Sequence, residues 1–364
     1  MTADAITGTA AAVLSALKAC APRHMSGEEM AGRLGVSRAA VWKAIDALRA
    51  RGYVIAASSG LGYRLDAEPD ILNADAIASY LREYSGADDI VPDAQRIHVF
   101  GEIDSTNTAA KTAAAAGGAL RGADGRLTAA GERLHKNVFC AETQTAGKGR
   151  QGRSFYSPAG RGLYMSLLYA PAGGVKKPAV ITAGAAVAVC RAASALYGRE
   201  CLIKWVNDVF YNGKKVCGIL TEGMINMETM LIESAVIGIG VNILDPIGGF
   251  PADTAGRAGS LLGSAAETAL NRSRFAAAVI GELLRILEAP GALEAAFGEY
   301  RRRSLLTGRT VTIYPLAGEF AQADRASFEA LVLGVTDGAE LIVERADGVR
   351  MTLDSGEASL HGSL

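Results

Sequence analysis

The residues best suited to chemistry lie in one short segment, residues 147–153, with the sequence GKGRQGR. Glycine lets backbone N–H groups approach an anion and tolerates positive φ, while Lys148, Arg150 and Arg153 add full positive charges. The segment therefore predicts a loop that surrounds a phosphate or carboxylate. Basic glycine-rich segments also occur as solvated turns, so this prediction depends on partners elsewhere in the chain.

Four further segments combine apolar strand patterns with polar residues. They are DSTN at 104–107, KWVND at 204–208, KKVCGILTE at 214–222 and GIGVNI at 238–243. The apolar residues before Lys204 predict a strand that presents this lysine from its end. Asn212 and Gly213 favour a tight primed turn between two strands. DSTN precedes an alanine-rich helix and contains side chains that commonly cap helices.

In this order the five segments resemble the motifs of the biotin–protein ligases, from about residue 97 to the end of the chain. Residues 1–66 are similar to the DNA-binding domain of the bifunctional ligase–repressors. The resemblance implies an α/β multidomain protein with three parts. These are a winged helix-turn-helix at 1–66, a central mixed α/β ligase domain (class II synthetase-like) at 67–303, and a C-terminal SH3-like β-barrel at 304–364.

The resemblance also implies carboxyl activation followed by acyl transfer. Biotin and ATP would give biotinyl-5′-AMP and pyrophosphate, and a lysine of the biotin carboxyl carrier protein would then accept the biotinyl group. Because the first step brings two anions together, electrostatic stabilisation and positioning should dominate, with Mg²⁺ on the phosphates. The implied catalytic residues are Lys204, which would bridge the two anions, and Arg150, which would retain the reactive adenylate.

Other site residues carry over from the same motifs. The expected biotin contacts are Ser105, Thr106, Asn107, Gln144, Lys148, Gly149, Arg150 and Lys204. The expected ATP contacts are Gly147, Arg153, Asn207, Asp208 and Asn242. The metal ligands are unknown, because no recognisable cluster is formed by His24, His98, His135 and His361.

Two residues depart from the family's usual pattern. Lys148 stands where arginine is commonest, which exchanges a planar fork of donors for a point charge. Val206 stands where proline is usual, so the turn that presents Asn207 and Asp208 is expected to be less rigid.

The first sixty-six residues predict a winged helix. Apolar spacing indicates one helix at 5–19 and another at 37–48. A helix between them begins at Ser26, which forms a capping box with Glu29, and a hairpin follows at 53–65. This unit has eight Lys and Arg against five Asp and Glu, or +3, which suits phosphate contact by a dimer. The expected DNA contacts are Ser26, Ser37, Arg38, Ala39, Ala40, Trp42 and Lys43. A winged helix used only for protein contacts is the alternative.

Several other segments have weaker signals. Residues 117–137 predict a surface loop without an assigned role, and residues 245–259 predict a loop that in the family closes over the adenine. The arginines at 301–303 indicate either a solvated helix face or a cap on the helix's negative end. Strands rich in β-branched residues are expected at 310–314, 330–335, 340–344 and 349–353.

Composition is that of a globular protein. The chain has 364 residues, 49% of them hydrophobic, and its net charge of −1 argues against a broadly polybasic surface. Five cysteines without a CxxC pair favour buried thiols over disulfides or a zinc ribbon. No signal peptide is expected, and Arg191 interrupts the apolar run from residue 178 short of a membrane span. A cytoplasmic protein that does not enter a membrane is therefore expected.

Three alternatives stay open from the residues. A lipoate-type protein ligase has a similar lysine motif but no winged helix of this kind. A non-catalytic, biotin-responsive transcription regulator would keep the pocket without turnover. A ligase whose winged helix no longer binds DNA would keep turnover alone. If biotinyl-5′-AMP orders residues 147–153, it would favour a homodimer that binds a palindromic operator.

Overall fold

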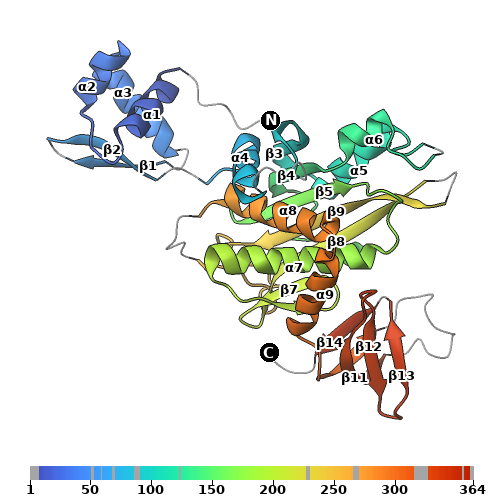
Figure 1. Ribbon diagram of the computed structural model, residues 1–364. Coiled ribbons are helices and arrows are strands. Elements are labelled where there is room, and N and C mark those ends of the chain that lie inside the picture. The colour runs from blue at the N-terminus through green and yellow to red at the C-terminus, as the bar shows by residue number, and fades with distance from the viewer. Residues whose placement is uncertain are drawn as a thin grey trace. The chain divides into compact units, whose positions relative to one another are not determined.

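The computed structural model describes residues 8–50, 53–58, 60–67, 70–85, 91–122, 124–226, 230–264, 270–314, 327–354 and 356–360. The chain forms two compact units, Met1–Ile71 and Leu72–Leu364 (Figure 1). Residues 5–7 of the first predicted helix and Ser59 of the predicted hairpin turn lie outside the described residues.

The N-terminal unit is a winged helix-turn-helix, as predicted. Its helices are α1 (Gly8–Cys20), α2 (Gly27–Leu34) and α3 (Arg38–Ala50), and its wing is an antiparallel pair of β1 (Val54–Ser58) and β2 (Gly62–Ala67). Ser26 caps α2 by accepting from the Glu29 N–H at 3.0 Å, and Ser37 caps α3 by accepting from the Ala40 N–H at 3.1 Å. The helices enclose an apolar core that includes Leu17, Met30 and Ile45.

The second unit is built on a seven-stranded mixed sheet with the order β3-β4-β5-β9-β8-β7-β6. Its strands are β3 (Ile97–Ile103), β4 (Asn137–Gln144), β5 (Gly162–Tyr169), β6 (Leu202–Lys204), β7 (Asp208–Tyr211), β8 (Lys214–Ile225) and β9 (Ile232–Asn242). Only β3 and β4 pair in parallel among these described strands, and the other neighbours are antiparallel. The predicted mixed sheet is therefore confirmed, and positive φ at Asn212 and Gly213 confirms the tight turn between β7 and β8.

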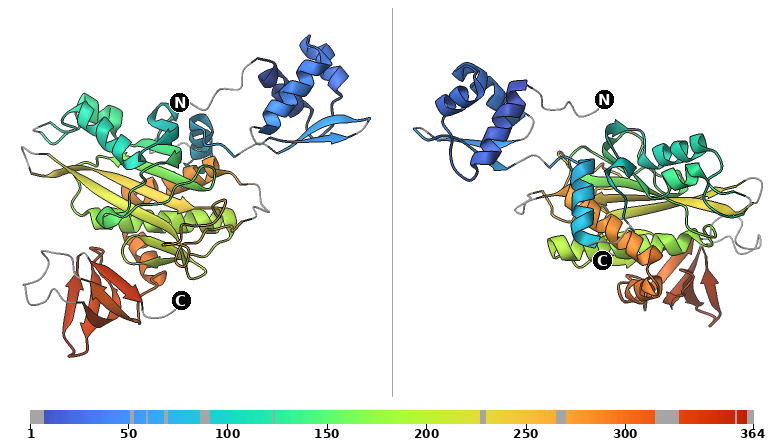
Figure 2. Two further views of the ribbon diagram at one scale, coloured as in Figure 1. Left: turned by 180° about the vertical axis from the view of Figure 1, so that it is seen from behind. Right: turned by 45° about the horizontal axis from the view of Figure 1, so that its top comes forward.

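Helices cover both faces of this sheet (Figures 1 and 2). They are α4 (Ala74–Ser85), α5 (Thr106–Gly117), α6 (Ala129–Leu134), α7 (Pro178–Tyr197), α8 (Arg272–Glu288) and α9 (Ala292–Arg302). Because strand side chains alternate between faces, Val138 joins the core under α7 and α8, whereas Phe139 joins a separate core under α5. α7 is long and apolar enough to cross a membrane, but 67% of its apolar window is buried within the protein, so it serves as a core helix.

The predicted surface loop at 117–137 is more ordered than expected. It contains α6, and the Leu120 side chain is buried against α5 and the sheet. The Arg121 guanidinium donates to the carbonyl oxygens of Gly125, at 2.6 Å, and Ala170, at 2.9 Å. The prediction was wrong because this segment, although rich in glycine and charge, places Leu120 in the core, with Leu127 and Leu134 partly buried against it.

The C-terminal part is a five-stranded antiparallel sheet, which confirms a small β-domain. Its strands are β10 (Thr310–Tyr314), β11 (Phe328–Val335), β12 (Leu341–Arg345), β13 (Arg350–Leu353) and β14 (Glu357–Leu360), in the order β13-β12-β11-β10-β14. The first four match the predicted strands. β14 was not predicted, since its sequence EASL contains no β-branched or aromatic residue, and it pairs with β10.

His135 makes the stability of this unit dependent on pH. Its Nδ1 accepts from the Ala170 N–H at 3.0 Å, and burial lowers the pKa of the imidazole to about 4. Because the unfolded imidazole titrates near 6.5, the unfolded state binds more protons between these values. We expect the free energy of unfolding to fall as pH drops from about 6.5 to about 4, by at most about 3 kcal/mol from this residue. Urea unfolding of His135→Asn should show a free energy of unfolding that depends less on pH across this range than that of wild type. An unchanged pH dependence would show that His135 is not its source.

Candidate active site

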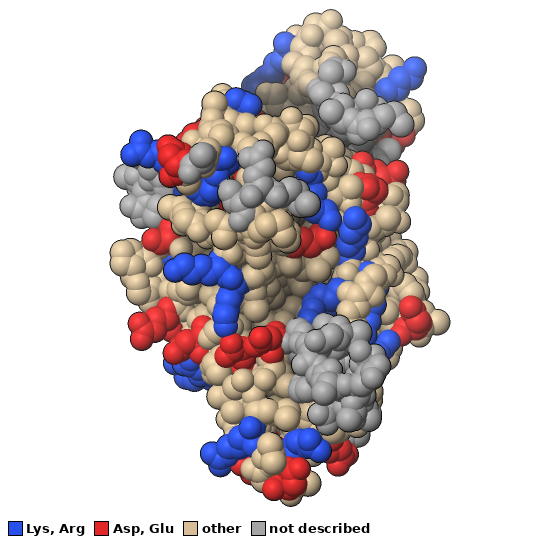
Figure 3. All heavy atoms as spheres, turned by 90° about the vertical axis from the view of Figure 1, so that its right-hand side faces the viewer, with Lys and Arg blue, Asp and Glu red and all other residues tan. Residues whose placement is uncertain are grey.

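A cavity of about 310 Å³ opens over the β-sheet of the second unit. It is strongly cationic: among the described residues that line it, the carboxylates are Asp208 and Glu357, whereas the basic side chains are Lys148, Arg150, Arg153, Lys204, Lys215 and Arg257. On the face shown in Figure 3, basic and acidic side chains are interspersed. Because the whole chain has a net charge of −1, the excess of positive charge among the lining residues is a feature of the cavity, and it suits a polyanionic ligand.

The predicted basic loop forms one wall of the cavity. Its backbone closes on itself, since the Gly149 N–H donates to the Arg153 carbonyl at 2.7 Å and the Phe155 N–H donates to the Gly147 carbonyl at 2.8 Å. A Cβ on Gly147 would lie 2.4 Å from the Phe155 carbonyl oxygen, so glycine is needed there for loop closure. Gly147 is absent from the described lining of the cavity, whereas Lys148, Gly149, Arg150 and Arg153 are part of it.

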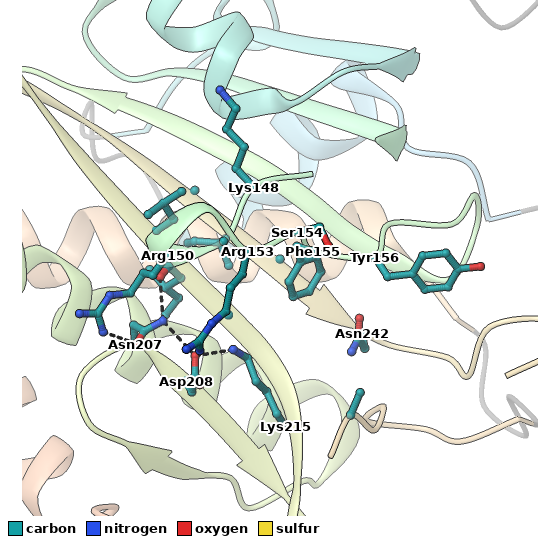
Figure 4. A pocket seen from close by; sticks show the side chains of 18 of the residues that line it. Lys148, Arg150, Arg153, Ser154, Phe155, Tyr156, Asn207, Asp208, Lys215 and Asn242 are labelled. Carbon is teal, nitrogen blue, oxygen red and sulfur yellow. Dashed lines mark hydrogen bonds and ion pairs between the residues drawn. The ribbon is translucent and has the colours of Figure 1, made fainter. Parts of the chain in front are cut away.

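The cations of the loop point in different directions (Figure 4). Arg150 donates to Asn207 Oδ1 at 2.9 Å, and Arg153 forms a two-pronged ion pair with Glu357, with Nη1 to Oε1 at 3.0 Å. Lys148 points away from both arginines. The loop therefore offers two arginines at one end of the cavity and an ammonium group at the other.

Lys204 ends β6, as predicted, and lies half-buried in the cavity. Burial lowers the pKa of its ammonium group, and the charges of Asp208 and Glu357 partly oppose this change. Across the turn, Asp208 pairs with Lys215 at 2.7 Å. A desolvated cation with few competing carboxylates is suited to bind a strongly anionic group.

The turn after Lys204 is held without the family's usual proline. The Trp205–Val206 peptide bond is cis, and both side chains are buried. Trp205 Nε1 donates to the Ala339 carbonyl at 2.8 Å, and the Tyr300 hydroxyl donates to the Val206 carbonyl at 3.3 Å. Asn207 Nδ2 donates to the Ile219 carbonyl at 3.2 Å. Contacts from outside the turn thus hold it in place, contrary to the looser turn expected.

A buried polar wall lies at the start of α5. Ser105 occupies the N-cap position but makes no side-chain cap bond, and Gln144 Oε1 instead accepts from the Thr106 N–H at 2.9 Å. Asn107 Nδ2 donates to Glu222 Oε2 at 2.8 Å, and its Oδ1 accepts from the Ser166 hydroxyl at 2.6 Å. The expected biotin contacts on DSTN are therefore brought together with Gln144.

Glu222 is the charged anchor of this wall. Burial raises the pKa of its carboxyl, but hydrogen bonds from Lys111 and Asn107, together with the charge of Lys148, lower it by more. Lys111 Nζ lies 2.6 Å from Glu222 Oε1. Because Glu222 takes a donor of the Asn107 amide, it fixes the orientation of that amide.

The loop at 245–259 is docked on the strands beside the cavity. Asn242 Nδ2 donates to the Gly259 carbonyl at 3.0 Å, and the Lys215 N–H donates to the Arg257 carbonyl at 2.9 Å. Phe250, Thr254, Arg257 and Ala258 line the cavity. The expected position of this loop at the site is consistent with these contacts.

Several lining residues were missed in the sequence. Phe155 follows the basic loop and lies over two strand glycines, because a Cβ on Gly240 would be 2.6 Å from its ring and one on Gly218 would be 3.5 Å away. Lys215 was part of a quoted motif without an assigned role. Glu357 had no detectable signal, since it comes from β14, some 200 positions after Arg153.

Gly238 provides a test of the polar wall. A Cβ there would lie 2.1 Å from Asn107 Oδ1, and Asn107 is buried. We expect Gly238→Ala to lower the free energy of unfolding by about 1–3 kcal/mol through overpacking, and to weaken biotin binding measured by calorimetry. Gly334→Ala is the matched control, because its Cβ meets nothing within 4 Å. Unchanged biotin affinity in Gly238→Ala would place the ligand elsewhere.

Most of the predicted DNA contacts are exposed on the first unit. Ser37, Arg38, Ala39 and Lys43 are exposed, and Trp42 is 56% exposed. Ala40 is half-buried, and Ser26 is occupied as the cap of α2. The exposed set lies on the cap and the first turns of α3, whereas Ser26 caps the preceding helix.

Comparison with known proteins identifies both units. A family model described as the Biotin/lipoate A/B protein ligase family matches residues 132–242, and one described as an HTH domain matches residues 10–64. The bifunctional ligase/repressor BirA of Bacillus subtilis is 34% identical over 244 residues, 67% of each chain. The proteins of that name from Bacillus spizizenii and Escherichia coli are 36% and 31% identical over 228 and 222 residues, 62% and 60% of this chain.

The chain spans less than two thirds of the length of these last two relatives, 62% and 59%. Among solved structures, a biotin protein ligase from Aquifex aeolicus in complex with biotin and ATP has a TM-score of 0.54. It is 21% identical, over 73% of this chain and 99% of that one, which establishes a shared fold. Together with the winged helix and the cationic cavity, the sequence match to the Bacillus subtilis protein shows that this chain belongs to the family of the bifunctional ligase/repressor BirA.

Proposed function

We propose that this chain activates biotin with ATP to biotinyl-5′-AMP and transfers the biotinyl group to a lysine of a biotin carboxyl carrier protein. The main support is the composition of the cavity, which is lined by Lys204, five other basic side chains and two carboxylates next to the buried polar wall of α5. This arrangement suits a ligand with a carboxylate and phosphates at one end and a polar ring at the other. Relatives named as biotin ligases support the choice of biotin.

In the first step, a biotin carboxylate oxygen forms a bond to the α-phosphorus and pyrophosphate leaves with the electron pair of the broken P–O bond. Lys204 lies half-buried at the strand end and would contact both anions. Its low solvent exposure strengthens this charge stabilisation relative to water. Lys215 and Arg153, now paired with Asp208 and Glu357, would contribute charge toward the phosphates.

In the second step, the acceptor amine attacks the acyl carbon, AMP leaves with the electron pair of the C–O bond, and the nitrogen releases a proton to solvent as the amide forms. Arg150, held by Asn207, would keep the acyl-adenylate from escaping and shield it from water. Lys148 and Gly149 would contact the same intermediate. Asn242 and the docked loop at 245–259 would border the adenine.

The described lining residues offer only the carboxylates of Asp208 and Glu357 to an Mg²⁺ that would enter with the nucleotide. Among the described residues no group of three His, Cys, Asp or Glu side chains could hold a metal, and the two lining carboxylates are paired with cations. Mg²⁺ commonly binds through substrate phosphates with one or two carboxylates, so Asp208 is the residue we assign to it. When bound, it would neutralise phosphate charge.

We further propose that residues 1–66 bind operator DNA and that biotinyl-5′-AMP acts as the corepressor. The exposed first turns of α3 support this proposal, with Arg38, Trp42 and Lys43 facing solvent. A charge of only +3 favours a homodimer over a single copy. Residues 67–303 would form the catalytic domain and 304–364 the C-terminal domain of a cytoplasmic protein.

The test is pyrophosphate–ATP exchange on the purified chain with biotin, and with lipoate as the competing acid. Exchange with biotin alone supports adenylation of biotin. Exchange with lipoate alone would make the chain a lipoate-type ligase. Biotin binding without exchange would indicate a non-catalytic regulator and contradict the proposed enzyme.

A further inference from the structure

The strand that carries Lys204 has an unusual outer edge. β6 has three residues and is the last strand of the sheet, with β7 on its inner side. On its outer side the Ile203 N–H donates to the Arg303 carbonyl at 2.7 Å, and the Leu305 N–H donates to the Ile203 carbonyl at 2.8 Å. The segment that follows α9 therefore takes the place of a missing strand.

The Arg303 side chain reinforces this edge. Its Nη1 donates to the Cys201 carbonyl, just before β6, at 3.0 Å, and to Glu200 Oε2 at 3.0 Å. Its Nε donates to Glu299 Oε1 at 2.8 Å. With 18% of its side chain exposed, Arg303 is held more firmly than a solvated arginine.

The anchor of Arg303 extends into the helical layer. Glu299 also accepts from Arg191 Nε on α7 at 2.8 Å, and Arg191 Nη1 lies 3.0 Å from Glu282 Oε2 on α8. Glu282 is buried, with 7% of its side chain exposed. The Arg303 guanidinium, which binds the residues just before β6, is thus connected through Glu299 and Arg191 to helices α7 and α8.

Tyr300 and Arg301, which precede Arg303 on α9, contact the turn after Lys204 and the C-terminal sheet. The Tyr300 hydroxyl donates to the Val206 carbonyl, and Arg301 Nε donates to the Val335 carbonyl on β11 at 2.8 Å. The expected position of the arginines at the end of the helix is confirmed, and Arg301 and Arg302 are exposed. The side chains of Arg301 and Arg303 also join separate elements, which the sequence did not predict.

We propose that Arg303 is a positioning residue for Lys204, and this rests on the proposed adenylation. An edge strand of three residues would fray without a partner on its open side. Lys204 must lie between two anions, and displacement of a positioned group by about 1 Å can cost about a hundredfold in rate. The Arg303 side chain binds the Cys201 carbonyl just before β6, and the Arg303 carbonyl accepts from the Ile203 N–H within β6. Through these two contacts Arg303 fixes the backbone of the strand that ends at Lys204.

The test compares Arg303→Met, Arg303→Lys and the matched control Arg302→Met in biotin-dependent pyrophosphate exchange. We expect Arg303→Met to lower kcat about tenfold, with KM for biotin and for ATP within about twofold of wild type. Arg303→Lys should recover part of kcat, since an ammonium group can still reach one acceptor. Arg302→Met should behave as wild type.

Thermal unfolding and hydrogen exchange separate positioning from stability. Rates are measured well below each variant's unfolding midpoint, and the Ile203 amide should exchange faster in Arg303→Met. A lower midpoint with unchanged kcat, or a rise in KM at unchanged kcat, would overturn the inference while leaving the adenylation intact. If Arg303→Met does not fold, the comparison of Arg303→Lys with wild type decides by the same criteria. Absence of exchange in the wild-type chain would remove the proposed function and this inference together.

Discussion

Lys204→Met is expected to lower kcat for biotin-dependent pyrophosphate exchange by about 10²–10³-fold, the usual loss when a positioned charge-stabilising donor is removed. The same variant should be more stable than wild type. Lys204 is a partly desolvated cation in a cavity with five other cations and two carboxylates, so its charge opposes folding. Methionine has a similar length without the charge.

The stability gain should depend on pH in a defined direction. Because burial lowers the pKa of Lys204 in the folded protein, the folded state loses this proton before the unfolded state as pH rises. The wild type therefore recovers stability as pH rises through the lowered pKa, and the advantage of Lys204→Met narrows. Chemical unfolding of both proteins from pH 7 to pH 10 measures this difference.

Lys214→Met is the control for the same exchange of side chains at an exposed position on β8. It should change neither exchange activity nor the pH profile of stability by a comparable amount. Near-wild-type exchange in Lys204→Met would refute the role of this lysine, whatever its stability.

Arg150→Ala is expected to shorten retention of biotinyl-5′-AMP about ten- to a hundredfold. Arg150 is held by Asn207 at 2.9 Å and lines the cavity, and a hydrogen bond from a charged donor contributes about 1.5–3 kcal/mol. If the adenylate is the corepressor, ligand-dependent operator binding should weaken in parallel, because the ligand can shift the dimer equilibrium only while it remains bound.

Two assays on one preparation measure this coupling. Release of radiolabelled biotinyl-5′-AMP gives the retention time, and gel shift of an operator fragment selected with the wild-type chain gives DNA affinity at fixed salt. Arg126→Ala is the control, since Arg126 is exposed and is not among the residues that line the cavity. Short retention with unchanged operator affinity would break the proposed link between the two activities.

Local patterns predicted the elements well. Ser26 and Ser37 correctly predicted the starts of α2 and α3, and Asn212 with Gly213 correctly predicted the turn between β7 and β8. These signals act over a few residues, because caps and tight turns satisfy backbone groups of their immediate neighbours. The failed prediction of a loop at 117–137 concerns a segment whose order depends on the packing of Leu120 against α5 and the sheet.

The sequence by itself determined the order of motifs, the winged helix and the placement of Lys204 at a strand end. Tertiary structure alone decided which charges face each other: Glu357 pairs with Arg153, Glu222 orients Asn107, and Arg303 closes the outer edge of β6. The reason is physical. Capping and strand alternation are local and have fixed periods, whereas ion pairs and hydrogen bonds across 100–200 positions depend on how the sheet brings distant side chains together.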